Sequence, residues 1–155
     1  MKQSLIEQYW QSYVATVSST FVAIEPYEMR QFGDSPALAN ELGNLILEGV
    51  KTATCSAVWE WEAERCEIPN VGAKTIVLDG HHCPLCIIET VEVMIRAFSE
   101  VDAQFAYAEG EGDRSLESWR TAHWQYFARV LPEIGRQPDV QMPLVCERFR
   151  VIYPL

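Results

Sequence analysis

The 155-residue sequence has no run of about 18 consecutive apolar residues, the length that a membrane-spanning helix requires. Its first residues mix charged with apolar side chains, unlike the continuous apolar region of a secretory signal. The five cysteines form an odd set in a chain without an export signal. We therefore expect a cytoplasmic protein with no membrane partner, reduced thiols and no disulfide framework.

Basic residues are scarce as well as scattered. The chain has 12 Lys and Arg against 22 Asp and Glu, a net charge of −10, and no two basic residues are adjacent. Nonspecific binding to a long nucleic acid depends on clustered positive charge. The charge pattern therefore argues against a general nucleic-acid-binding protein. It is compatible with a small nucleoside-like ligand, or with a short single-stranded RNA that is bound locally.

Composition and periodicity predict one α+β domain. Apolar residues make up 48% of the chain and charged residues 22%, which is ordinary globular usage. Apolar spacing and capping residues predict helices, and β-branched runs predict strands. We expect helices over 4–18, 35–49, 56–65, a short segment after Ser99 and 115–131, and strands over 20–24, 74–78, 86–95 and 144–153, with residues 51–54 as a connecting turn.

The most unusual local feature is an acidic loop in which Glu109, Glu111 and Asp113 alternate with two glycines. Such a loop is often only solvated, and its charge favours the start of the following helix. Glu111 lies between the two glycines and is the better functional candidate. A site for a hard cation formed by all three carboxylates is an alternative, although the loop provides no cage on its own.

A second feature is the segment Gly49–Thr54, which contains Lys51 and Thr54. If Thr54 starts a helix, the free backbone N–H groups there could stabilise an oxyanion. A lysine with a lowered pKa could then activate the threonine hydroxyl. The alternative is that Thr54 only caps the helix while Lys51 points into solvent.

The predicted helix after Ser115 carries Trp119, His123 and Tyr126 on one side, next to Arg120. An aromatic stripe at this spacing is usually part of a core. The imidazole of His123 is the exception, because it could orient a ligand or a carboxylate.

The segment from His81 to Cys86 contains two histidines and a Cys-x-x-Cys pair, which is compatible with a zinc or redox site. A structural zinc requires four ligands, and no second Cys-x-x-Cys pair is present. We predict a turn without metal, followed by a strand in which Cys86 is buried.

Taken together, eight segments resemble the ASCH family, and they extend over nearly the whole chain. They are FGDS (32–35), GVKTAT (49–54), PNVG (69–72), LDG (78–80), PLCIIET (84–90), FAYAEGEGD (105–113), SLESWRTAH (115–123) and LVCERF (144–149). The resemblance implies a small β-barrel like that of the RNA-binding PUA domain, with helices packed around it. The domain would extend over residues 1–155, with a helical extension at its N-terminus.

The resemblance also implies three kinds of function. Some small members resemble amidohydrolases that remove an acyl group from N4-acylated cytidine without a cofactor. Others resemble ribonucleases that cleave single strands with a divalent metal, and a third kind binds RNA without catalysis. In the amidohydrolase pattern the working residues correspond here to Lys51, Thr54 and Glu111. We expect the surrounding substrate-binding residues to be Thr52, Glu109, Asp113, Trp119, Arg120 and His123.

Overall fold

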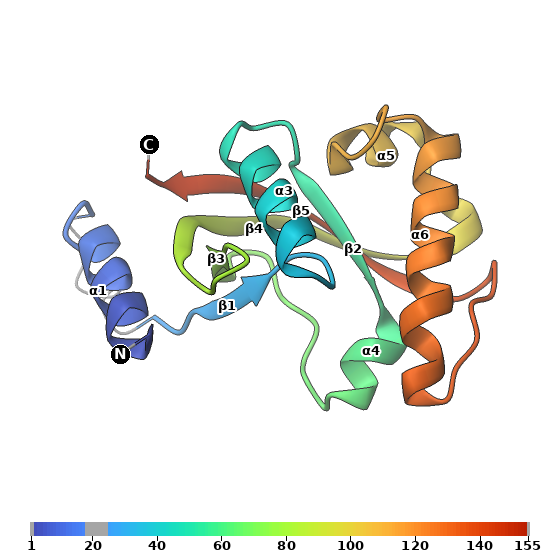
Figure 1. Ribbon diagram of the computed structural model, residues 1–155, viewed down its shortest axis with the longest axis horizontal. Coiled ribbons are helices and arrows are strands. Elements are labelled where there is room, and N and C mark those ends of the chain that lie inside the picture. Colours follow the sequence, from blue (N-terminus) through green and yellow to red (C-terminus); the bar gives the residue numbers. More distant parts are fainter. Residues whose placement is uncertain (1, 18–24, 155) are drawn as a thin grey trace. The chain divides into compact units, whose positions relative to one another are not determined.

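The computed structural model describes residues 2–17 and 25–154 (Figure 1). These residues form an α+β structure, as the sequence predicts. The chain divides into two compact units, one made of residues 1–49, 72–90 and 149–155 and the other of residues 50–71 and 91–148. The elements in chain order are α1 (Lys2–Val14), β1 (Glu28–Gln31), α3 (Pro36–Leu47), β2 (Ala53–Ala57), α4 (Val58–Ala63), β3 (Lys74–Leu78), β4 (Pro84–Ala97), η1 (Phe98–Glu100), α5 (Ala103–Glu109), α6 (Leu116–Val130), η2 (Leu131–Ile134) and β5 (Pro143–Tyr153).

In the first unit, strand β3 lies between β1 and β4, and its side chains are buried on both faces. β3 runs parallel to β1 and antiparallel to β4. Val77 packs in a cluster with α3 residues, whereas Ile76 and Leu78 pack in a cluster with α1 residues. Successive strand residues point to opposite faces, so a continuous apolar run is what a strand covered on both sides requires. The predicted strand over 74–78 is confirmed.

Helix α3 follows its sequence signals closely. The Ser35 hydroxyl accepts a hydrogen bond from the Leu38 N–H, and Pro36 occupies the first turn. The helix buries Leu42 and Ile46. It ends before Gly49, whose φ of +76° is accessible to glycine at little cost.

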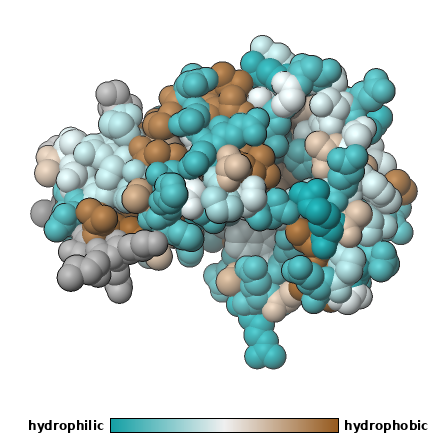
Figure 2. All heavy atoms as spheres, in the orientation of Figure 1, coloured by the Kyte–Doolittle hydropathy of each residue, from teal (hydrophilic) through white to brown (hydrophobic). Residues whose placement is uncertain are grey.

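In the second unit, β2 pairs antiparallel with β5 and contacts α4 and α5. Ala53 and Ala57 of β2 are fully buried in a cluster that α5 and α6 complete. Polar side chains predominate over α4 and α6 on the face shown in Figure 2. Among the described residues, no helix has the length and apolar character needed to cross a membrane.

The structure corrects the prediction for residues 51–65. Thr54 does not begin a helix, because residues 53–57 form strand β2 and α4 begins only at Val58. Pairing with β5 and burial of Ala53 and Ala57 outweigh the helical propensity of this Ala-rich and Glu-rich stretch. Thr54 therefore has no free helical N–H groups beside it.

Other boundaries differ in smaller ways. Helix α1 begins at Lys2, so Ser4 lies inside it rather than capping it. Strand β1 was not predicted, and the predicted strand over 20–24 lies outside the described residues. Helix α5 is capped by Asp102, not Ser99, whereas Ser115 caps α6 as predicted.

The segment from His81 to Cys86 is a turn followed by a strand. One carboxylate oxygen of Asp79 accepts hydrogen bonds from the N–H groups of His81 and Cys83. Cys86 is fully buried in β4, as predicted, while Cys83 is exposed. All five cysteines are free thiols.

Candidate functional site

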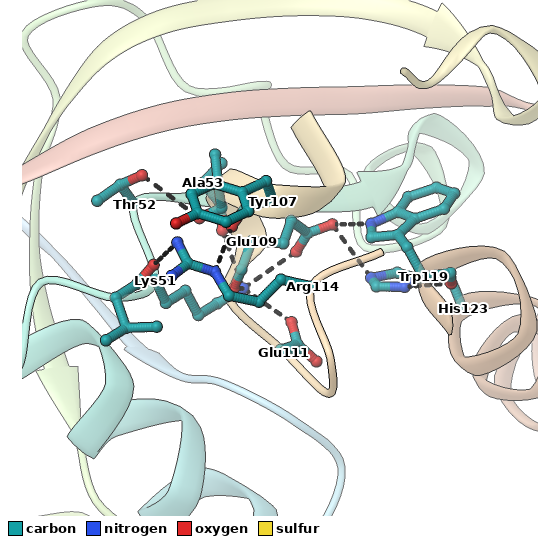
Figure 3. Close-up of polar contacts among 11 residues, drawn as sticks. Lys51, Thr52, Ala53, Tyr107, Glu109, Glu111, Arg114, Trp119 and His123 are labelled. Carbon is teal, nitrogen blue, oxygen red and sulfur yellow. Dashed lines mark hydrogen bonds and ion pairs between the residues drawn. The ribbon is translucent and has the colours of Figure 1, made fainter. Parts of the chain in front are cut away.

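The side chain of Lys51 lies at the centre of a buried polar cluster in the second unit (Figure 3). Its Nζ is 2.9 Å from the Ala53 carbonyl, 3.3 Å from the Glu109 carbonyl, 3.0 Å from Glu109 Oε1 and 2.9 Å from Glu111 Oε2. Burial alone would lower the pKa of Lys51, but the two carboxylates raise it above its usual value. An ammonium group offers three N–H donors to these four oxygens, whereas a neutral amine offers two and would point a lone pair at an acceptor.

Glu109 is the buried carboxylate of this cluster, with only 1% of its side chain exposed. Its Oε1 accepts a hydrogen bond from Lys51, and its Oε2 accepts one of 2.5 Å from the Trp119 indole. Burial would raise the pKa of Glu109, yet Lys51 and His123 hold it well below its usual range. Glu109 is therefore an ionised carboxylate with its oxygens occupied.

His123 approaches the same carboxylate from α6. Its Nε2 is 3.1 Å from Glu109 Oε2, and its Nδ1 is 2.9 Å from the Trp119 carbonyl. The ring stacks on the Trp119 indole, with a centroid distance of 4.2 Å and an interplanar angle of 17°. Burial would lower the pKa of His123, but the Glu109 carboxylate raises it above its usual value.

The loop after α5 reaches Lys51 because Gly110 has no side chain. Gly110 ends α5 with a φ of +76°, the left-handed conformation that glycine adopts readily. A Cβ there would lie 2.7 Å from the Val50 carbonyl oxygen and 2.9 Å from the Lys51 Cα. Such distances are not tolerated, so the glycine between Glu109 and Glu111 is required for the two carboxylates to reach Lys51.

Arg114 and Tyr107 also hold this loop, and the sequence interpretation missed both. Arg114 donates hydrogen bonds to the carbonyls of Tyr107 and Val50, at 3.0 and 3.2 Å. Its guanidinium carbon lies 3.5 Å from the centroid of the Tyr107 ring, a cation–π contact. The only sequence signal was an arginine directly after the acidic loop. Its partners are 7 and 64 positions away, beyond the reach of a local pattern.

The structure places Thr54 in strand β2, three residues after Lys51. It lies in β2 opposite Glu147 of β5, and it is followed by Cys55, whose thiol approaches Glu109 and His123. Adjacent strand residues point to opposite faces, so Thr54 points away from the face that Cys55 occupies. Among the described contacts, no hydrogen bond joins the Thr54 hydroxyl to Lys51. The interpretation that a lowered pKa lets Lys51 activate Thr54 is wrong in its premise, because the pKa of Lys51 is raised.

The remaining predicted site residues have different surroundings. The Thr52 N–H and hydroxyl both donate to the Ala108 carbonyl, which ties the segment before β2 to α5. Asp113 accepts hydrogen bonds from the backbone N–H and hydroxyl of Ser115 at the start of α6. Arg120 is exposed on α6. The structure thus brings Lys51, Glu109, Glu111, Trp119 and His123 together, whereas no described contact joins Arg120 to them.

One trio of side chains in the described part of the chain has the composition of a metal site. A thiol, a carboxylate and an imidazole, from Cys55, Glu109 and His123, have ligand atoms within 4.8 Å of one another. Burial and the Glu109 charge raise the pKa of the Cys55 thiol, which disfavours the thiolate that a metal requires. The Glu109 oxygens already accept hydrogen bonds from Lys51 and Trp119. Binding of a metal would have to displace these donors.

Comparisons with known proteins define the class of the fold and then the family. An ASCH domain structure from Lactobacillus crispatus JV V101 is 33% identical, with a TM-score of 0.87; the match covers 98% of this chain and 94% of that one. A protein structure from Enterococcus faecalis V583 is 34% identical, with a TM-score of 0.84 and coverage of 98% and 90%. The fold is the PUA-like α+β fold expected from the sequence.

The sequence model of the ASCH domain matches residues 28–153. The chain therefore belongs to the ASCH domain family. A search of curated proteins found no match.

Proposed function

We propose that this protein hydrolyses an amide bond on an acylated nucleoside, with N4-acetylcytidine as the test substrate. The observation that carries the proposal is the pair formed by Lys51 and Glu111. A fully buried ammonium lies 2.9 Å from a carboxylate of which 28% is exposed. Glu111 is thus the partly accessible end of a buried charged network, where a proton can be exchanged with a substrate. Membership of the ASCH family supports the class of substrate.

We assign the proton transfers to Glu111, because the charge state of Lys51 leaves it no role as a base. Lys51 is surrounded by acceptors and stays an ammonium, so it stabilises negative charge and does not act as a base. Glu111 accepts the proton of the attacking hydroxyl and then gives it to the leaving amine. This assignment replaces the interpretation in which Lys51 is the base.

Thr54 is the proposed nucleophile. Its hydroxyl oxygen attacks the acyl carbon while its proton moves to Glu111 through a bridging water, since no described hydrogen bond joins the two side chains directly. The C–N bond then breaks, the amine takes that proton, and the acyl group remains on Thr54 as an ester. Water then loses a proton to Glu111 and attacks the ester. The acyl group leaves as the acid, and the proton returns from Glu111 to the Thr54 oxygen, which restores the hydroxyl. Strand β2 lies at the edge of the sheet, and Lys51 shortly precedes it, three residues from Thr54.

Net charge favours a small, uncharged substrate over a long RNA. A chain with a net charge of −10 and no adjacent basic residues repels polyanions on average. A neutral nucleoside experiences no such repulsion. Among the residues expected to bind substrate, Glu109 and Trp119 are buried and bonded to each other, so we assign them to support of the site.

The experiment is to incubate purified protein with N4-acetylcytidine and, separately, with short single-stranded RNA, each with and without a chelator. The proposal is supported if acetate and cytidine are released at the same rate with and without the chelator. Cleavage of RNA only with an added divalent cation would replace it with the ribonuclease alternative. Binding of either compound without turnover would leave the binding-module alternative.

A further inference from the structure

The two nitrogens of His123 both face hydrogen-bond acceptors. Nδ1 is 2.9 Å from the Trp119 carbonyl oxygen, and Nε2 is 3.1 Å from Glu109 Oε2. A neutral imidazole has one donor and one acceptor nitrogen, so it would point a lone pair at one of these oxygens. Only the doubly protonated ring satisfies both contacts. The geometry therefore identifies the ring as an imidazolium, in a side chain of which 12% is exposed.

The charges around this ring are balanced only if it is a cation. The groups around it are Glu109 from α5, Glu111 from the following loop and Cys55 from β2, while Lys51 binds the other oxygen of the same Glu109 carboxylate. Two cations and two carboxylates sum to zero, while a thiol at Cys55 adds no charge. A neutral His123 would leave two carboxylates to the single Lys51 cation, one of them the fully buried Glu109.

We propose that His123 is a positioning residue that acts as a cation: through Glu109 it holds the Lys51 ammonium against Glu111. The inference rests on the proposed function and adds to it a residue whose described contacts do not include Lys51 or Glu111. Glu109 connects the two, because its Oε2 faces His123 while its Oε1 accepts from Lys51. Trp119 keeps the imidazolium in place by stacking on it and by accepting from Nδ1.

The competing interpretation is a metal ion held by Cys55, Glu109 and His123. It requires the opposite protonation state, with a lone pair on Nε2 and a thiolate on Cys55. The two interpretations therefore differ in the number of protons on the His123 ring. They differ also in whether purified protein contains a stoichiometric metal.

The first test uses nitrogen-15 NMR of the wild-type protein at neutral pH. The His123 ring is assigned as the signal that is absent from His123→Gln. We expect two protonated ring nitrogens on His123, and no stoichiometric metal by elemental analysis. A single protonated nitrogen would overturn the proposal, and so would one equivalent of zinc that His123→Gln loses.

The second test measures turnover of N4-acetylcytidine by His123→Gln, Glu109→Gln and the double variant. Glutamine keeps a hydrogen-bond donor but removes the charge. We expect kcat to fall about 100-fold with little change in KM, because a small displacement of Lys51 and Glu111 misplaces the reacting groups. The double variant should be no slower than Glu109→Gln, since His123 acts through Glu109. Losses that multiply in the double variant would contradict this.

A third readout separates failure of this inference from failure of the proposed function. It is the distance between Lys51 Nζ and the Glu111 carboxylate in crystal structures of wild type and His123→Gln. We expect the 2.9 Å contact to be lost in the variant, and to return in His123→Lys, which restores a cation. A retained contact would overturn the positioning role, whatever the substrate. If wild type hydrolyses no acylated nucleoside while the contact is lost as expected, only the proposed function fails.

Discussion

Lys51 and Glu109 form an ion pair of 3.0 Å in which each side chain is only 1% exposed, although the residues are 58 positions apart in the chain. Removing two charges from water is costly, and attraction between them compensates only when the remaining donors and acceptors are satisfied. Here the Ala53 carbonyl, Glu111 and Trp119 satisfy them. Each member of the pair therefore depends on the other for its stability in the interior.

Removing one member of this pair should destabilise the protein more than removing both charges. Lys51→Met leaves Glu109 buried without its main cation, so we expect the free energy of unfolding to fall by about 3–5 kcal/mol. The double variant Lys51→Met/Glu109→Gln should recover part of this loss. Urea denaturation of the three proteins measures the effect. A double variant less stable than Lys51→Met would contradict the pairing.

The approach of the acidic loop to Lys51 can be tested with two glycine substitutions. Gly110 and Gly49 share a φ of +76°, but a Cβ meets backbone atoms only at Gly110. Gly49→Ala should cost about 1–2 kcal/mol for the left-handed conformation alone. Gly110→Ala should cost clearly more, because the Val50 carbonyl and Lys51 must move. Equal losses of stability for the two variants would show that the loop does not need this approach.

The stability of the protein should depend on the charge of His123. Its pKa is raised from 6.5, so its contribution is fully present below pH 6.5 and is lost as the pH rises through the higher folded value. Glu109, whose pKa is lowered, stays ionised over this range. The difference in urea midpoint between wild type and His123→Gln should therefore shrink from pH 6 to pH 9. A difference that grows with pH would contradict an imidazolium.

Much of the fold could be predicted from local pattern. Ser35 with Pro36, and Ser115, mark the starts of α3 and α6 because capping is a short-range interaction. The strand over 74–78 could be predicted because Thr75, Ile76 and Val77 are consecutive β-branched residues. Strand β2 was not, since its strand conformation depends on pairing with β5, about 90 residues later in the chain.

The candidate site likewise combines features that a local sequence pattern indicates with features that depend on distant contacts. The glycines around Glu111 distinguish this loop in the sequence, because a backbone with positive φ favours glycine. The direction of the pKa change of Lys51 could not be read from the sequence, since it depends on Glu109 and Glu111 meeting one ammonium. The stacking of Arg114 on Tyr107 is likewise a product of the folded loop.

The role of Thr54 as a nucleophile predicts that its hydroxyl, and not its methyl group, is required. Thr54→Ser should keep measurable turnover of N4-acetylcytidine, whereas Thr54→Val, which keeps the shape, should reduce kcat by several orders of magnitude. Mass spectrometry of wild type after rapid acid quenching should detect an acyl group on Thr54. Full activity in Thr54→Val would assign the attack to water.

In the proposed reaction, Glu111 exchanges the proton at the accessible end of the Lys51 network. The most direct measurement is the rate of acetate release from N4-acetylcytidine by wild type and by Glu111→Gln at saturating substrate. Glutamine keeps the shape of Glu111 but cannot accept the proton, so kcat should fall by about 100-fold or more, while the unfolding midpoint changes little. An unchanged kcat in a folded Glu111→Gln variant would contradict the account.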